Sequence, residues 1–131
     1  MADWLMKTEP SDYSFADLEN AGKAVWDGVK NPAALRNLAA MKKGDRVAVY
    51  HTGDEKAVVG RAVVTGEAYP DPKAKNPRLL VVELAAGKRL ARPVTLAEIK
   101  AQAIFATSPL VRQGRLSVVA LTPAQWQALT E

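Results

Sequence analysis

The segment AVWDGVKNP, at residues 24–32, is the stretch around which we expect the rest of the chain to be organised. It places a large aromatic side chain, Trp26, directly before a carboxylate, Asp27, and a glycine, Gly28. Asn31 followed by proline is a typical helix start, because the Asn side chain accepts from free backbone N–H groups and proline suits the first helical position. The segment therefore predicts a turn, with an indole beside it, that leads into a helix.

Trp26 has two interpretations. An indole beside exposed N–H groups and a carboxylate suits a flat, hydrogen-bonding ligand such as a nucleobase. Alternatively, Trp26 belongs to the hydrophobic core and Asp27-Gly28 is an ordinary turn. Because large aromatic side chains are mostly buried, these residues alone favour the core interpretation.

Composition limits the class of protein. With 131 residues, of which 48% are hydrophobic, the chain can bury one core, so we expect a single domain over residues 1–131. No apolar run approaches the ~18 residues of a membrane span, and the N-terminus lacks the pattern of a signal peptide. We therefore expect a cytoplasmic protein. The net charge of +4 is compatible with an anionic partner.

Few residues are suited to hold a metal or a cofactor. The chain has no Cys and a single His, His51, so a zinc or redox-metal site is not expected. It also has no glycine-rich phosphate-binding motif, so no nucleotide cofactor is expected. For His51, a packing or capping role and a binding role are equally compatible with its place at the end of a strand.

Local patterns predict an α+β fold of six or so strands with short helices. Capping motifs mark helix starts at Ser14, Asn31, Thr95 and Thr122. Strands are expected over 3–7, 46–51, 57–65, 78–84 and 115–121, with 46–51 and 57–65 as a hairpin. The simplest arrangement is a curled sheet that closes into a partial barrel.

Three details of this arrangement are also expected. Gly60, inside a strand, indicates a bulge or a close backbone approach. Residues 86–88 should turn the strand 78–84 back into a short partner at 89–91. Residues 66–77, with three prolines, should form a surface loop.

The segment Lys7-Thr8-Glu9 is the one cluster suited to acid–base chemistry. A lysine that leaves an apolar strand loses part of its hydration, which lowers its pKa. The alternative, which these residues alone favour, is a solvated strand end. Adjacent strand residues point to opposite faces, so the three side chains are not expected to converge.

A series of ordered motifs resembles the EVE domain family across essentially the whole chain. The motifs are WLMKTEP (4–10), WDGVKN (26–31), MKKGD (41–45), YHT (50–52), Gly60, AYPD (68–71), PVTL (93–96) and RLSV (115–118). Their common order makes the resemblance far more specific than any single motif.

The resemblance implies a PUA-like fold, which is a mixed β pseudo-barrel with short peripheral helices. It also implies a non-catalytic domain that reads a modified base in DNA or RNA by stacking it in a pocket, with neither cofactor nor metal. The predicted base pocket comprises Lys7, Thr8, Trp26, Asp27, Gly28, Val29, Tyr50, His51, Thr52 and Ser117. Phosphate contacts are expected from Lys30, Arg36, Arg112 and Arg115, because backbone contacts need only cations near a groove. Trp26 then packs on one face only, and its loss should cost less stability than the loss of a buried tryptophan, with a modestly lowered midpoint.

The sequence departs from the family pattern after Pro77-Arg78, where Leu79-Leu80 replace an aromatic pair found in many relatives. If one of those aromatics completes a cage, the cage is open on that side here. Two other functions remain open. One is a small amidohydrolase acting on modified nucleosides, which would resemble the ASCH group of PUA-like proteins and would use Lys7, Thr8 and Glu9. The other is a protein-interaction module.

Overall fold

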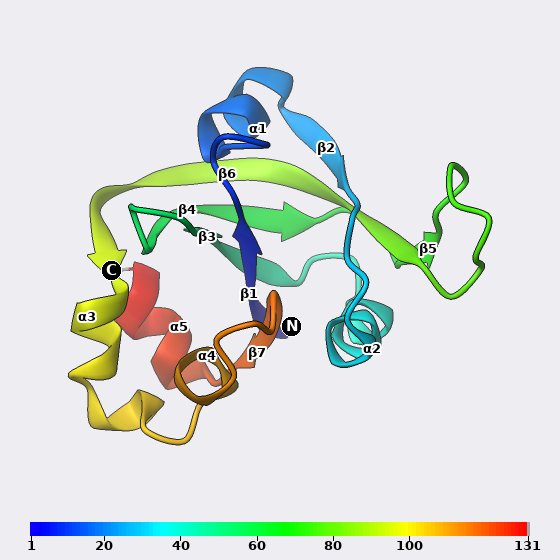
Figure 1. Cartoon of the computed structure of the whole chain (residues 1–131). Helices are drawn as coiled ribbons and strands as arrows, with labels where there is room; N and C mark the ends of the chain where they lie inside the picture. The colour runs from blue at the N-terminus through cyan, green and yellow to red at the C-terminus, as the bar shows by residue number, and fades with distance from the viewer. Residues whose placement is uncertain (131) are drawn as a thin grey trace.

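The computed structural model describes residues 1–130 and confirms an α+β fold (Figure 1). In chain order the elements are β1 (Asp3–Thr8), α1 (Phe15–Ala21), β2 (Lys23–Trp26), α2 (Pro32–Ala40), β3 (Arg46–His51), β4 (Ala57–Val64), β5 (Tyr69–Pro70), β6 (Leu80–Thr95), α3 (Leu96–Lys100), the short 3-10 helix η1 (Ala103–Phe105), α4 (Pro109–Arg112), β7 (Val118–Leu121) and α5 (Pro123–Thr130). Within this range, no helix is both long and apolar enough to cross a membrane.

One mixed sheet organises the molecule. Its strand order is β2-β6-β4-β3-β1-β7, and β5 adds to β6. Strand β1 runs parallel to β3 and antiparallel to β7, so the first strand lies inside the sheet rather than at its edge. In the view of Figure 1, α3, α4 and α5 gather on one side of β4 and β6, and α1 lies on the other.

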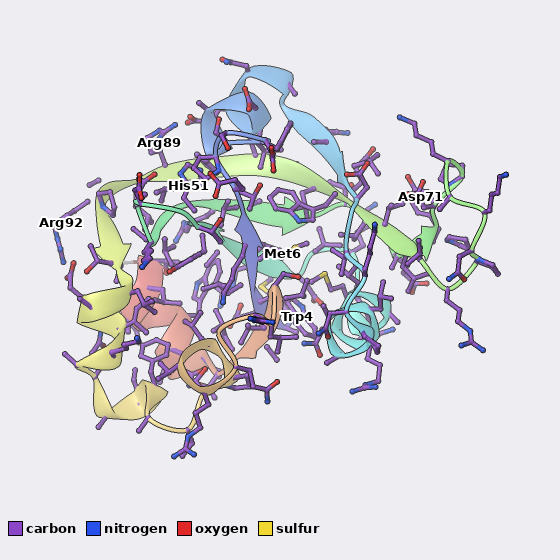
Figure 2. All side chains as sticks on the ribbon, in the orientation of Figure 1. Trp4, Met6, His51, Asp71, Arg89 and Arg92 are labelled. Atoms are coloured by element: carbon purple, nitrogen blue, oxygen red, sulfur yellow. The ribbon has the colours of Figure 1, made fainter. Side chains whose placement is uncertain are left out.

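The core lies on both faces of β1 because helices and curled strands cover each side. Leu5 and Met6, which point to opposite faces of β1, are both fully buried. Figure 2 shows Trp4 and Met6 in the middle of the molecule and Arg89 and Arg92 at its edge. The apolar run at the start of the chain is thus an interior strand, as expected.

The predicted helix caps are confirmed. The Ser14 side chain accepts from the backbone N–H of Asp17 and the Asp17 carboxylate accepts in return, which is a capping box at the start of α1. Thr95 and Glu98 form the same arrangement at α3. Asn31 Oδ1 accepts from the first free N–H groups of α2, and proline occupies its first turn.

Gly60 is the point at which α1 packs on the sheet, and the expected irregularity there is confirmed. The pairing of β4 with both β3 and β6 shifts register around Gly60. A Cβ at Gly60 would lie 2.5 Å from Cε1 and Cε2 of Phe15, the fully buried first residue of α1. Glycine therefore leaves the space that the Phe15 ring fills.

The predicted turn at residues 86–88 is wrong, because β6 continues through it as one strand of 16 residues. Gly60 of β4 pairs with Arg89 of β6, and Ala62 pairs with Ala86, so β6 has one more residue than β4 between these two pairs. Such an extra residue is a bulge, which bends the strand but does not turn the chain back. Gly87 serves this bend: a Cβ there would lie 2.7 Å from the carbonyl oxygen of Arg61 on β4. The short strands β2 and β5 were not expected, and β5 lies within the segment predicted as a loop.

Asp45 fastens the start of the chain to the turn before β3. Its carboxylate accepts from the backbone N–H of Ala2 at 3.0 Å, from Trp4 Nε1 at 3.0 Å and from the backbone N–H of Lys42 at 2.9 Å. Burial raises the pKa of Asp45, but the three hydrogen bonds together lower it by more than burial raises it. The pKa of Asp45 therefore lies below the ordinary value.

We expect Asp45→Asn to lower the free energy of unfolding by about 1–3 kcal/mol at pH 7, because an amide nitrogen replaces one of the accepting oxygens. A carboxyl with a lowered folded-state pKa stabilises the fold above its unfolded pKa, and this contribution is lost as the pH falls through the folded pKa. The difference between the parent and the variant should therefore shrink below about pH 4. Urea unfolding at pH 7 and pH 3 measures this difference in the free energy of unfolding. Asp54→Asn, at an exposed position, is the control. A difference that stays constant over this range would contradict the assignment.

Candidate functional site

A cavity of about 530 Å³ opens between the end of β1 and the end of β2. The segments that line it are the end of β1 and the turn after it, β2 with the loop that leads to α2, and the residue before β7. Its lining residues are Lys7, Thr8, Glu9, Asp12, Tyr13, Val25, Trp26, Asp27, Gly28, Val29, Lys30 and Ser117.

Two aromatic rings form a corner of the cavity. Tyr13 and Trp26 meet edge to face, with ring centroids 6.2 Å apart and planes at 85°. Trp26 ends β2, where it pairs with Val82 of β6, and is only 8% exposed. Trp26 therefore lines the cavity and also belongs to the hydrophobic core, so the two interpretations of this residue are not alternatives. The expectation that it packs on one face only is wrong.

Charged side chains of both signs surround this corner. Glu9, Asp12, Asp27, Lys7 and Lys30 all line the cavity. Within residues 1–130, the side chains of Asp12, Asp27 and Lys30 make no hydrogen bond or ion pair. A ligand in the cavity would thus find free acceptors and a free cation at its rim.

The polar groups of Thr8 and Glu9 are already engaged by neighbours. Thr8 Oγ1 donates to the carbonyl oxygen of Tyr13 at 2.6 Å. Glu9 accepts from Thr52 Oγ1 at 3.0 Å and from Ser11 Oγ at 3.1 Å, and these hydrogen bonds lower the pKa of Glu9. The three consecutive residues of the Lys7-Thr8-Glu9 cluster all line the cavity. Their polar groups nevertheless contact three different neighbours, Gly114, Tyr13 and Thr52, which agrees with the expectation that the three side chains do not converge.

Lys7 lies at the wall of the cavity. Its Nζ donates to the carbonyl oxygen of Gly114 at 2.9 Å and lies 5.6 Å from the ring centroid of Tyr50. Burial lowers the pKa of the Lys7 ammonium. The distance to the ring is within the range of a cation–π contact, so two neighbours hold the side chain in place.

Seven of the ten residues predicted as the base pocket share this cavity. They are Lys7, Thr8, Trp26, Asp27, Gly28, Val29 and Ser117. Tyr50 and Thr52 instead line a separate cavity of about 220 Å³, which adjoins the first one at Lys7. The prediction that they share a pocket with Trp26 is wrong, because β3 lies on the other side of Lys7.

His51 lines neither of these two cavities, so its assignment to the base pocket is also wrong. Its ring is 6% exposed, and Nε2 accepts from the backbone N–H of Phe15 at 3.0 Å. Nδ1 lies 2.7 Å from Glu55 Oε1, which fits an Nδ1–H tautomer that donates to the carboxylate. His51 therefore caps the start of α1, which is the capping role left open by the sequence.

The four cations predicted to contact phosphates lie on different elements. Lys30 lines the cavity beside Trp26, and Arg36 is exposed on α2. Arg112 ends α4 and its Nε donates to the carbonyl oxygen of Ala106, whereas Arg115 is exposed in the segment before β7. Their contacts with phosphates stay a prediction. Leu79 and Leu80 lie outside the lining of the cavity.

Sequence reasoning missed Asp12, Tyr13 and Val25, and it considered Glu9 only as an acid–base group. Of these residues, Tyr13 had the clearest signal in the sequence. An aromatic residue just before a helix cap predicts packing, and its packing partner here is Trp26. Val25 could not be placed because β2 was not recognised as a strand. Within the described part of the chain, no group of three or more His, Asp or Glu side chains is arranged to hold a metal ion.

Comparison with known proteins agrees with the fold and with the arrangement of the motifs. The model of the EVE domain matches residues 2–131. Human thymocyte nuclear protein 1 is 32% identical over 157 aligned residues, which cover 94% of this chain and 70% of that protein. An NMR structure of a Rhodopseudomonas palustris protein is 38% identical, with a TM-score of 0.92, and covers 99% of this chain and 91% of that one.

A crystal structure of the human protein THYN1 in complex with DNA that contains 5-methylcytosine is also similar. It is 30% identical with a TM-score of 0.87, and the match covers 99% of this chain and 96% of that one. The fold shared by these proteins is the PUA-like one. The match to the family model over nearly every residue, together with these likenesses over most of the chain, establishes that the chain belongs to the EVE domain family.

Proposed function

We propose that this protein binds DNA and holds one modified base in the cavity beside Trp26. The observation that carries the proposal is the aromatic corner of Tyr13 and Trp26 in a cavity of about 530 Å³. Cavities of ~300–1,000 Å³ are typical of small-ligand sites. The structure of the human relative with DNA that contains 5-methylcytosine supports the choice of DNA.

Stacking would supply the binding energy. A base that lies flat on one ring of the corner presents its edge to the other ring, because the two rings are nearly perpendicular. Base–aromatic stacking contributes about 1–3 kcal/mol per base. To reach the cavity the base must leave the duplex, which costs a few kcal/mol of unstacking and unpairing.

The carboxylates would select the kind of base. Asp12 and Asp27, which have no partner within residues 1–130, are hydrogen-bond acceptors at the rim. Carboxylates accept from the exocyclic amine of cytosine. The lining is thus suited to a base that carries an amine, and Val25 and Val29 beside Trp26 offer apolar contact for a methyl group.

The hydrolase alternative gains one observation, because Lys7, Thr8 and Glu9 line the same cavity. The hydrogen bonds argue against it. Thr8 Oγ1 already donates to a backbone carbonyl, and the carboxylate of Glu9 is held by Thr52 and Ser11 rather than by Thr8. A nucleophile needs a base within hydrogen-bond reach to take its proton, and this trio makes no such contact. We therefore propose a reader and not an enzyme.

Binding of duplexes that differ only in one 5-methylcytosine tests the proposal. The parent protein should prefer the methylated duplex, and Asp12→Ala and Asp27→Ala should each weaken that binding by roughly tenfold, since one base contact contributes about 1–3 kcal/mol. Both residues are exposed, so the fold should be unaffected. Fluorescence anisotropy at a stated salt concentration measures the affinities.

Asp54→Ala is the matched control, because Asp54 is an exposed carboxylate in the loop between β3 and β4, outside this cavity. Equal affinity of the parent for the two duplexes would contradict methylcytosine as the ligand. Equal effects of Asp27→Ala and Asp54→Ala would remove the carboxylates of the cavity from base recognition.

A further inference from the structure

The second cavity, on the other side of Lys7, differs from the first in its charge. It has a volume of about 220 Å³ and is lined by three lysines, Lys7, Lys56 and Lys100, with no carboxylate in the lining. The uncharged part of its wall includes Tyr50 and Leu110. A concave site with one sign of charge is suited to an anion.

Lys56 and Lys100 also line a neighbouring cavity with Asp54 and Glu55, but neither lysine is paired with an acid in the described part of the chain. Lys56 and Lys100 make no ion pair or side-chain hydrogen bond with any of residues 1–130. The adjacent carboxylates have other partners, since Glu9 accepts from Thr52 and Glu55 lies against His51 Nδ1. The positive charge of the cavity is thus available to a ligand.

Lys56 occupies a backbone conformation that lysine rarely adopts. Its φ is +45°, and it is the one non-glycine residue with a positive φ among residues 1–130. The carbonyl oxygen of Lys56 accepts from the backbone N–H of Leu96 at 2.8 Å, and the next residue, Ala57, pairs with Thr95. These contacts hold the loop against the start of α3 and fix the point from which the Lys56 side chain leaves the backbone.

The two cavities adjoin at Lys7, which lines both. The Lys7 ammonium is fixed between the carbonyl of Gly114 and the ring of Tyr50, so its position does not depend on a ligand. A nucleotide with its base in the first cavity would place its backbone near this wall, and phosphate contacts set the position of a strand without reading its sequence.

We propose that the second cavity binds a backbone phosphate next to the extruded base, through Lys56 and Lys100 on one side and Lys7 on the other. This inference rests on the proposed function, because it assigns the phosphate site of the same bound strand. The ligand chemistry is a phosphate group, and a free phosphate ion is the other source of that group.

The test measures DNA affinity against salt concentration for Lys56→Gly, Lys100→Gln and the double variant, with methylated and plain duplexes. Each lysine that contacts a phosphate should reduce the slope of log K against log salt by about 0.9. The ratio of affinities for the two duplexes should stay as in the parent. Lys43→Gln, an exposed lysine in the turn before β3, is the control and should leave the slope almost unchanged.

Lys56→Gly keeps the test free of folding effects, because glycine adopts a positive φ at no steric cost and the variant should unfold at or above the midpoint of the parent. Slopes that match those of Lys43→Gln, with base preference intact, would overturn this inference alone. If the parent showed no preference between the two duplexes, but the salt slopes were still reduced in the lysine variants, the proposed base site alone would be overturned. Inorganic phosphate should bind far more weakly than the duplex. The cavity would instead be assigned to a free anion if phosphate bound tightly, if Lys56→Gly abolished that binding, and if the salt slope of DNA binding did not change.

Discussion

Trp26→Ala is expected to lower the free energy of unfolding by about 3–5 kcal/mol and to abolish the preference for a modified base. The first effect follows because Trp26 is 8% exposed and belongs to the core, and truncation of a buried Trp leaves a large cavity. The second effect follows because the same ring is one wall of the aromatic corner, and loss of stacking removes about 1–3 kcal/mol of binding. Urea unfolding and duplex binding measure the two effects separately.

Trp26→Phe and Trp126→Ala separate the role in the core from the role in the cavity. Trp26→Phe keeps a ring in place and should fold and retain part of the base preference. Trp126, on α5, is as deeply buried but does not line the cavity, and the Arg46 guanidinium lies 4.7 Å from its ring centroid. Trp126→Ala should therefore lose comparable stability with no change in base preference among molecules that remain folded. A Trp26→Ala protein that unfolds at the midpoint of the parent and still prefers the modified base as strongly as the parent would refute both roles.

Gly60→Val is expected to unfold the protein, or to lower its free energy of unfolding by about 3 kcal/mol or more. The Cβ alone would lie 2.5 Å from two atoms of the Phe15 ring, and Phe15 is fully buried. Relief requires a shift of α1, whose first N–H is also held by His51 Nε2. Since Tyr13 precedes α1, a shifted α1 would also open the aromatic corner. Circular dichroism during thermal unfolding measures the loss.

Gly66→Val is the matched control for this prediction. A Cβ at Gly66 would meet no atom within 4 Å, and Gly66 does not have a positive φ. The same substitution should therefore change the unfolding midpoint only slightly. Gly60→Ala should fall between the two. Equal midpoints for Gly60→Val and Gly66→Val would show that Phe15 can move at little cost.

The sequence predicted the elements with local signals and failed where long-range contacts decide. Capping side chains act on N–H groups three residues away, so α1, α2 and α3 begin where the sequence places their caps. Gly87 is different: it resembles a turn residue, yet its function is the close approach of Arg61 on another strand, which no local pattern can reveal. Strand β2 is short and is defined by its pairing with β6, so its sequence alone carried too little signal.

The site was predictable to the extent that its residues are close in sequence. Trp26, Asp27, Gly28 and Val29 are consecutive and line one cavity, as the opening segment suggests. Tyr50, His51 and Thr52 belong to one family motif, but Tyr50 and Thr52 line the cavity on the far side of Lys7, whereas His51 contacts the start of α1. A motif shared by relatives identifies residues that matter and does not say which of two adjoining cavities each one faces.

The position of β1 between β3 and β7 determines the order in which the sheet can assemble. Met6 pairs with Val118, so the first strand must wait for nearly the whole chain before its second edge is covered. Such a high contact order slows folding, because the entropy of closing a long loop is lost before the contacts that compensate for it have formed. During synthesis, an apolar strand with an open edge is exposed to pairing with other chains. A nascent chain of this protein is thus most vulnerable to aggregation until its last strand has left the ribosome.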